Sequence, residues 1–200
     1  IPHIVYNGVD LGIYKPGKKS KTPIILYIGR LTTAKSIQIL LNAFFQIKKD
    51  IPSASLTIAG DGPNRQKLEK LSAKLGLSSK VTFLGKVSEE DKIKLYQEAW
   101  VFVNPSLLEG WGITTIEANA CGTPVIASNV AGLKDAVVDG VSGILVPYGN
   151  VQALTLTLAT LLSNQKLRSK LSLGATKLAQ NYDWNNSAKQ ALSYLTGKLS

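Results

Sequence analysis

The chain has 200 residues, of which 44% are hydrophobic, and its 23 basic and 13 acidic side chains give a formal net charge of +10. Length and hydrophobic content suffice for one large globular domain or two small ones. The longest apolar runs, such as 24–28, fall far short of the roughly eighteen residues that cross a bilayer. The single cysteine, Cys121, excludes an internal disulfide and lies in an apolar segment, which favours a small buried thiol.

The basic residues are lysines with three exceptions, Arg30, Arg65 and Arg168. Nucleic-acid binders rely on arginine for base readout and phosphate contacts, whereas lysines dispersed over helices usually form a solvated face. We therefore expect no nucleic-acid partner. We expect a cytoplasmic protein whose basic surface is solvated or makes peripheral contact with anionic lipid. Because the chain begins at Ile1 and contains no methionine, we also expect it to be a fragment of a longer protein.

Short apolar runs alternate with helical patterns along the chain. The segments between the runs, including 37–49, 64–75 and 89–98, place apolar residues three and four positions apart. This alternation predicts an α/β fold, a doubly wound, Rossmann-like parallel sheet of about six strands with helices on both faces. We expect a single domain over 1–200, with a linker-like segment over 1–22, an α/β core over 23–147 and two or three helices over 148–200. The expected strands are 24–28, 55–59, 81–84, 100–103, 125–128 and 144–146.

A small or helix-breaking residue follows every expected strand. The carboxyl ends of parallel strands lie along one edge of a sheet, and ligands of such folds bind in the crevice outside that edge. Functional residues are therefore expected directly after the strands. The residues at these ends are Gly29, Gly60, Gly85, Pro105, Asn129 and Pro147.

Glu109 and Glu117 are the only charged residues between Glu98 and Lys134. They flank Gly110-Trp-Gly112, which leads from a strand end into a helical pattern over 113–120. Backbone N–H groups at that helix start would bind phosphate, and the two carboxylates would accept hydrogen bonds from sugar or ribose hydroxyls. The alternative is that Glu117 only favours the helix N-terminus and that Glu109 is solvated.

The octapeptide GRLTTAKS over 29–36 is one residue away from a phosphate-binding P-loop. Ala34 stands where a P-loop requires glycine, immediately before the lysine. Arg30 and Lys35 nevertheless follow the first expected strand, at the same sheet edge as the Gly110-Trp-Gly112 turn, where two cations would hold a diphosphate. The alternative is a pair of unrelated surface cations.

Gly60-Asp-Gly62 offers a second, weaker nucleotide-binding pattern. A dinucleotide fingerprint continues to a third glycine and leads into a helix, but here Pro63 follows and the pattern stops. A turn before a helix that starts near Asn64 is the better interpretation.

Short motifs are spread over nearly the whole chain, and their order and spacing are more specific than any one of them. The pair Glu109 and Glu117, with seven residues between, is the most specific feature. The motifs are Asn7-Gly-Val-Asp10 with Pro16, Gly29-Arg-Leu31 with Lys35, Ile58-Ala-Gly-Asp-Gly-Pro63, Phe83-Leu-Gly85, Pro105-Ser106, Glu109-Gly-Trp-Gly112 with Glu117-Ala118, Gly122-Thr-Pro-Val125, Gly132, Asp139-Gly140 and Gly143. Together they resemble the C-terminal, nucleotide-sugar-binding half of a GT-B glycosyltransferase of retaining family 4, the glycosyl transferases group 1.

The resemblance implies a role for each candidate site residue. Arg30 and Lys35 would hold the diphosphate and offset the charge that builds on it as the sugar leaves. Glu109 would contact hydroxyls of the transferred sugar, and Glu117 would contact the ribose. Backbone groups over 112–115 would bind phosphate, and the strand end over 85–87 would meet the base. The remaining implied binding residues are Gly29, Gly85, Lys86, Val87, Gly110, Gly112, Ile113, Thr114 and Thr115.

The resemblance also implies a hexosyltransferase that uses a UDP-, GDP- or ADP-sugar, retains the anomeric configuration without a protein nucleophile and needs no cofactor or essential metal. Its N-terminal acceptor domain is absent from this chain, so we expect weak binding of the nucleotide sugar and no turnover. The last helix, over 184–195, would pack on that absent domain. The alternatives are a P-loop-like NTPase, a non-catalytic binding module and a GT-B epimerase or phosphorylase.

Two positions depart from the family pattern. Ser36 replaces the glycine that commonly follows the lysine, and Asn119 stands where methionine is frequent. We expect both changes to alter packing more than chemistry.

Overall fold

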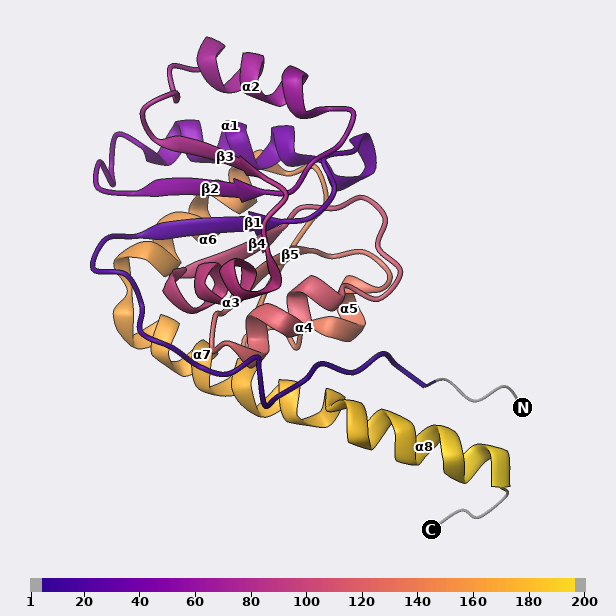
Figure 1. The fold of residues 1–200 in the computed structure, drawn as a ribbon. Coiled ribbons are helices and arrows are strands. Elements are labelled where there is room, and N and C mark those ends of the chain that lie inside the picture. The colour runs from indigo at the N-terminus through magenta and orange to yellow at the C-terminus, as the bar shows by residue number, and fades with distance from the viewer. Residues whose placement is uncertain (1–4, 197–200) are drawn as a thin grey trace.

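The computed structural model describes residues 5–196, which form a parallel β-sheet enclosed by helices (Figure 1). This is the α/β fold expected from the sequence. The strands are β1 (Ile24–Ile28), β2 (Ser55–Ala59), β3 (Val81–Gly85), β4 (Val101–Asn104), β5 (Val125–Ser128) and β6 (Gly143–Val146). The helices are α1 (Ile37–Ile47), α2 (Arg65–Lys74), α3 (Glu89–Glu98), α4 (Ile113–Ala120), α5 (Leu133–Ala136), α6 (Val151–Ser163), α7 (Gln165–Ala179) and α8 (Trp184–Thr196).

The strand order is β3-β2-β1-β4-β5-β6, and every neighbouring pair is parallel. The chain first winds outward from β1 to β3 and then crosses back to β4 beside β1, so the order reverses between β1 and β4. In open parallel sheets, this switch point is where the crevice for a ligand forms, outside the carboxyl ends of the two strands. The topology therefore predicts that a ligand binds beside the residues that follow Ile28 and Asn104.

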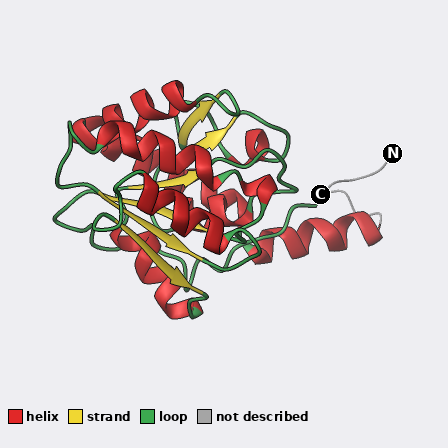
Figure 2. Cartoon of the chain, turned by 90° about the horizontal axis from the view of Figure 1, so that it is seen from above, coloured by secondary structure: helices red, strands yellow, loops and turns green. Residues whose placement is uncertain are grey.

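Helices cover both faces of the sheet because alternate residues of each strand point to opposite faces. In β1, Ile25 and Tyr27 pack into one buried cluster, and Leu26 and Ile28 pack into the other. The first cluster includes residues of α1, α2 and α6, and the second includes residues of α3, α4 and α5. Figure 1 shows α1 and α2 on one side of the sheet and α3, α4 and α5 on the other, and the helices flank the strands again in Figure 2.

Helix boundaries follow the local signals in the sequence. Ser88 caps α3, because its hydroxyl accepts a hydrogen bond from the Asp91 N–H, and three acidic residues occupy the first turn of this helix. Gly76, with φ of +64°, ends α2, as expected. β1, β2, β5, α3 and α4 have the expected bounds, and the other expected elements differ by one or two residues at an end. The four-residue α5 was not expected.

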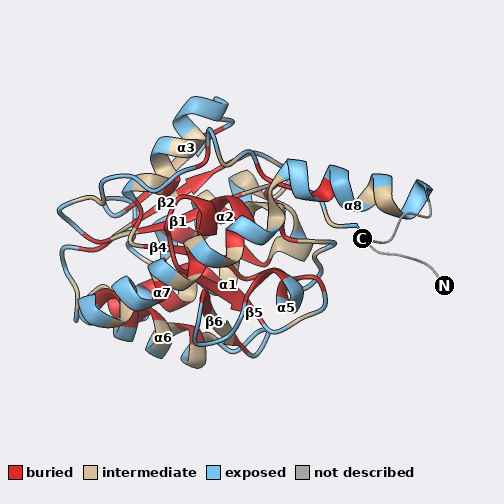
Figure 3. Cartoon of the chain, turned by 90° about the horizontal axis from the view of Figure 1, so that it is seen from below, coloured by how far each residue is buried: buried red, intermediate tan, exposed pale blue. Residues whose placement is uncertain are grey.

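The first residues of the described chain lie against the segment that precedes α8 and against Trp111. The N–H of Val9 donates to the Tyr182 carbonyl oxygen, and Tyr6 stacks on Trp111 with ring centroids 3.9 Å apart. α8 then extends away from the body of the molecule (Figure 1), and most of its surface is exposed (Figure 3). Among the described residues, no helix is both long enough and apolar enough to span a bilayer. Residues 1–4 of the expected linker-like segment and residues 197–200 of the expected helical segment lie outside the residues that the structure describes.

Candidate ligand-binding crevice

A pocket of about 220 Å³ lies at the switch point, outside the carboxyl ends of β1 and β4. Six of the residues that the sequence singled out line it, together with Tyr27, Ile28 and Asn104. They come from two stretches far apart in the sequence, 29–35 and 109–114, which the parallel sheet brings together. These six are Gly29, Arg30, Lys35, Glu109, Ile113 and Thr114.

Lys35 and Glu109 form an ion pair inside this pocket. Lys35 Nζ lies 2.7 Å from Glu109 Oε2, and the two side chains are only 22% and 17% exposed. The amide of Asn104, at the end of β4, lies 3.4 Å from the same carboxylate oxygen, and Asn104 Oδ1 accepts a hydrogen bond of 2.6 Å from the Ser106 hydroxyl. The carboxylate of Glu109 is therefore oriented from two sides, and the sequence did not indicate Asn104.

Arg30 is exposed and makes no ion pair with any residue in 5–196. Its backbone carbonyl oxygen is held by the hydroxyl of the buried Tyr27 at 3.0 Å. Burial and the charge of Glu109 raise the pKa of this phenol, so Tyr27 stays protonated and remains a hydrogen-bond donor. The backbone at Arg30 is thus fixed while its guanidinium is available to an anion.

The N-terminus of α4 faces the same pocket through Ile113 and Thr114. Gly112 precedes the helix with φ of +75°, a left-handed conformation that favours glycine, and no side chain caps this helix end. The N–H of Thr115 already donates to the Gly112 carbonyl oxygen at 2.8 Å. The N–H groups of Gly112, Ile113 and Thr114 have no acceptor within the described residues, so they can bind an anion.

The loop that carries Glu109 is held from behind by tight packing. A Cβ atom on Gly132 would lie 2.2 Å from the Glu109 carbonyl oxygen, so only glycine fits there. The Trp111 side chain is covered by Tyr6 and Tyr182, and its indole N–H donates to the Asn7 carbonyl oxygen at 3.2 Å. Trp111 is therefore an anchor for the loop, a role that the sequence did not reveal.

Glu117 does not line the pocket of Lys35 and Glu109, although it belongs to α4, as do Ile113 and Thr114, which line it. Glu117 is only 8% exposed, and both oxygens of its carboxylate have a partner. Tyr96 donates to Oε2 at 2.9 Å, and Lys92 Nζ lies 3.1 Å from Oε1. Burial and the charge of Glu117 raise the pKa of the Tyr96 phenol well above its usual value, so Tyr96 remains a donor. Lys92 also pairs with Glu89 at 3.0 Å. Residues 89, 92 and 96 share one face of α3, and this spacing was the signal that could have identified them.

A second, open pocket of about 550 Å³ adjoins the first through Arg30. Lys86 lines it, as do Asp61 and Gly62. The carbonyl oxygen of Gly85 accepts a hydrogen bond from the Gly60 N–H at 2.6 Å, which ties the ends of β2 and β3 together. Of the expected base-contacting residues 85–87, only Lys86 lines this opening. Val87 is half-buried against the α3 and α4 side, and Gly110 is exposed in its loop.

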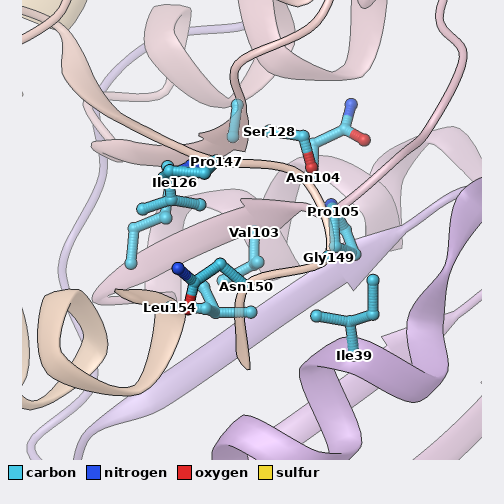
Figure 4. A pocket seen from close by; sticks show the side chains of 12 residues that line it. Ile39, Val103, Asn104, Pro105, Ile126, Ser128, Pro147, Gly149, Asn150 and Leu154 are labelled. Atoms are coloured by element: carbon cyan, nitrogen blue, oxygen red, sulfur yellow. The ribbon is translucent and has the colours of Figure 1, made fainter. Parts of the chain in front are cut away.

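A further small pocket lies deeper, beneath residues 146–154 (Figure 4). Its cavity is about 10 Å³, the size of a single water molecule, and Ile39, Ile126 and Leu154 are among its apolar walls. Asn104 lines this pocket as well as the larger one. The small pocket is thus a packing void behind the crevice and has no room for a ligand.

Neither GRLTTAKS over 29–36 nor Gly60-Asp-Gly62 forms the nucleotide-binding loop that its sequence resembles. Residues Thr33–Lys35 make one turn of 3₁₀ helix, and Lys35 points to Glu109. Ser36 follows with φ of +53°, which explains why glycine is common at this position in the family pattern. Gly60-Asp-Gly62 forms the expected turn before α2, with Gly62 against the backbone of Leu31.

Comparison with known proteins agrees with the sequence motifs. The glycosyl transferases group 1 family matches residues 13–178. A D-inositol 3-phosphate glycosyltransferase of Frankia alni is 34% identical over 98% of this chain and 53% of its own length. The chain therefore spans about half the length of such relatives.

Solved structures share the fold. Sucrose-phosphate synthase from Thermosynechococcus elongatus superposes with a TM-score of 0.89 at 30% identity, over 98% of this chain and 52% of that one. The Anabaena protein HepE, in a complex with UDP-glucose, superposes with a TM-score of 0.87 at 25% identity, over 98% and 57% of the two chains. The chain described here belongs to the glycosyl transferases group 1 family and has the fold of one half of a GT-B glycosyltransferase.

Proposed function

We propose that this chain is the nucleotide-sugar-binding half of a retaining glycosyltransferase. The observation that carries the proposal is the crevice at the β1–β4 switch point, where Arg30, the Lys35–Glu109 pair and the N-terminus of α4 line one pocket. The UDP-glucose bound by HepE supports a nucleoside diphosphate sugar as the ligand. The lengths of the relatives support an acceptor site in a second half of the enzyme.

The charges of the crevice suit a diphosphate with a sugar attached. Arg30 and the free N–H groups before Thr115 would hold phosphate oxygens. Lys35 has three N–H donors, so it can serve a phosphate oxygen and Glu109 together. Glu109 would accept hydrogen bonds from sugar hydroxyls and thereby place the anomeric carbon beside the phosphate.

Transfer then requires little chemistry from this half of the enzyme. The bond between the anomeric carbon and the diphosphate oxygen breaks, and the acceptor oxygen bonds to the same face of the sugar. The acceptor proton passes to the leaving phosphate oxygen. Arg30 and Lys35 offset the negative charge that grows on the diphosphate, which lowers the barrier electrostatically. We expect this chain by itself to bind the nucleotide sugar and to transfer nothing.

Calorimetric titration with UDP-glucose, GDP-mannose and ADP-glucose tests this proposal. We expect one of them to bind with a dissociation constant of about 1 mM or below, and the Arg30→Gln variant to bind it at least about tenfold more weakly. Lys70→Gln, which removes a positive charge from the exposed side of α2, is the control and should bind like the wild type.

Two results would contradict the proposal. One is the absence of saturable binding by all three nucleotide sugars while the chain is folded. The other is magnesium-dependent ATP hydrolysis that Lys35→Gln abolishes and Glu109→Gln leaves unchanged, which would favour the P-loop alternative.

A further inference from the structure

Another pocket lies at the opposite edge of the sheet, where β4 and β5 begin. Trp100 precedes β4, Pro124 precedes β5, and α7 closes the pocket from the side. Its cavity is about 280 Å³, comparable in size to the crevice at the carboxyl edge. Nothing in the proposed transfer reaction uses it.

Arg168 brings a partly satisfied guanidinium to this pocket. Its guanidinium carbon lies 4.0 Å from the centre of the Trp100 ring. Nη1 donates to the carbonyl oxygens of Leu161 and Leu162 at the end of α6, at 2.6 and 2.8 Å. Nε and Nη2 have no acceptor within the described residues. The stacking and the two backbone contacts therefore fix the guanidinium in place and leave part of it free for a ligand.

Lys19 supplies a second cation from the segment that precedes β1. Its Nζ donates to the Thr123 hydroxyl and to the Tyr96 carbonyl oxygen, so one of its three N–H donors remains. Burial lowers the pKa of Lys19 to about 8 and also lowers the pKa of Arg168. These directions are those of cations that have lost water without gaining an anion.

Acidic side chains are missing from the lining of this pocket. Within residues 5–196, neither Lys19 nor Arg168 forms an ion pair, whereas Lys35 and Lys92 in the rest of the molecule each pair with a glutamate. Hydroxyl groups of Ser169 and Ser172 add hydrogen-bonding capacity to the wall. Both cations are partly buried and have no counter-charge, which is unfavourable by itself, and an anion bound in the pocket would offset that cost.

We propose that this pocket is a binding site for a small phosphate monoester. The ligand must match two positive charges, and a phosphate monoester carries about −1.5 to −2 at pH 7. Its oxygens suit both a planar guanidinium and an ammonium group. The cavity is larger than a bare phosphate needs, which leaves space for a small polar group attached to it.

Titration with glycerol 3-phosphate, with inorganic phosphate in a parallel series and glycerol as the neutral control, tests the site. Amide shifts in a ¹⁵N-labelled chain locate binding, and we expect saturable shifts at Gly122 and Ser169 at concentrations below about 10 mM. Tighter binding of glycerol 3-phosphate assigns the monoester. Equal or tighter binding of inorganic phosphate would show that the attached group contributes nothing and would overturn the monoester assignment.

Variants separate this site from the crevice and from general charge attraction. Lys19→Gln and Ser169→Glu should each weaken binding at least about tenfold, because one removes a cation and the other adds an anion on an exposed position. Lys166→Gln, on the exposed surface of α7 outside the pocket, should bind like the wild type.

Three outcomes overturn the inference. They are the absence of saturable shifts, equal weakening in Lys19→Gln and Lys166→Gln, and binding that Arg30→Gln abolishes while Lys19→Gln does not. The last would place the phosphate in the crevice, and it would leave the proposed function intact.

Discussion

Gly132 shows how a single residue without a side chain sets the position of the candidate site. The carbonyl oxygens of Glu109 and Gly110 occupy the space where its Cβ atom would lie, at 2.2 and 2.7 Å. Gly132 directly precedes α5, so the close approach at this residue fixes the loop that carries Glu109. Gly140 also has a positive φ, +70°, but nothing lies within 4 Å of its hypothetical Cβ. Substitution of Gly140 therefore introduces backbone strain alone, whereas substitution of Gly132 introduces both strain and a steric clash.

We expect Gly132→Ala to lower the free energy of unfolding by at least about 3 kcal/mol, because the loop backbone must move to admit the methyl group. Gly140→Ala, which introduces the strain of a positive φ without the contact, should lower it by about 1 kcal/mol. Urea denaturation of the two variants measures both values. Equal losses would show that the packing of Gly132 against Glu109 does not hold the loop.

At the scale of elements, α3 and α4 are joined through the buried carboxylate of Glu117. Tyr96 and Lys92 come from α3 and engage both oxygens of Glu117 on α4. A carboxylate has about four lone-pair sites, so two contacts leave capacity for ribose hydroxyls. If Glu117 contacts the ribose, as the family resemblance implies, α3 positions that carboxylate, although neither Glu117 nor any residue of α3 lines the pocket of Lys35 and Glu109.

Tyr96→Phe should weaken the binding of UDP about tenfold, because the loss of one hydrogen bond of about 1.5 kcal/mol frees Glu117 to rotate. The binding of 2′,3′-dideoxy-UDP should not change, since that ligand offers no ribose hydroxyls to the carboxylate. Calorimetry compares the two ligands.

The control is Tyr148→Phe, which removes a hydroxyl that contacts Ser36 at 3.1 Å and lies away from α3. Equal weakening of both ligands by Tyr96→Phe would mean that Tyr96 acts on the general packing of α4, and the ribose assignment of Glu117 would lose its support.

At the scale of the whole molecule, α8 stands apart from the two buried clusters. Trp184, Leu192 and Leu195 are 52%, 61% and 86% exposed, and Ser187 is the buried residue of this helix. Exposed apolar residues on the last helix are what the family resemblance implied, because that helix would pack on an acceptor domain. The exposure is confirmed, and the packing partner remains a proposal.

Leu195→Asp should change the free energy of unfolding of this chain by no more than about 0.5 kcal/mol, because the side chain is largely in water already. Leu158→Ala, in the fully buried stripe of α6, should lower it by about 2–5 kcal/mol. Urea denaturation of both variants decides the point. A loss above about 1 kcal/mol in Leu195→Asp would show that α8 folds back onto the body in solution.

The fold was largely predictable because each element carries its own periodicity. Apolar runs with β-branched residues predicted every strand, and apolar residues three and four positions apart predicted α1 to α3. The Gly110-Trp-Gly112 turn predicted the start of α4. α5 was missed because four residues are too short to show a helical period. The left-handed backbone of Ser36 also went unpredicted, since serine gives no signal for it.

The candidate site was predictable only in part. Sequence motifs identified Arg30, Lys35 and Glu109, and the structure brings all three into one pocket. The contacts that hold them, from Tyr27 and Asn104, were not foreseen, because these residues look like ordinary members of buried strands.

By itself, the sequence determined the order of strands and helices, the residues at the strand ends and the family, because these depend on local periodicity and on motif spacing. Only the tertiary structure decided which of those strand ends meet, since β1 and β4 become neighbours through the reversal of the sheet order. It also decided that Glu109 pairs with Lys35 while Glu117 turns to Tyr96 and Lys92. Charge pairing depends on distances of a few ångströms in space, and positions along the chain do not fix them.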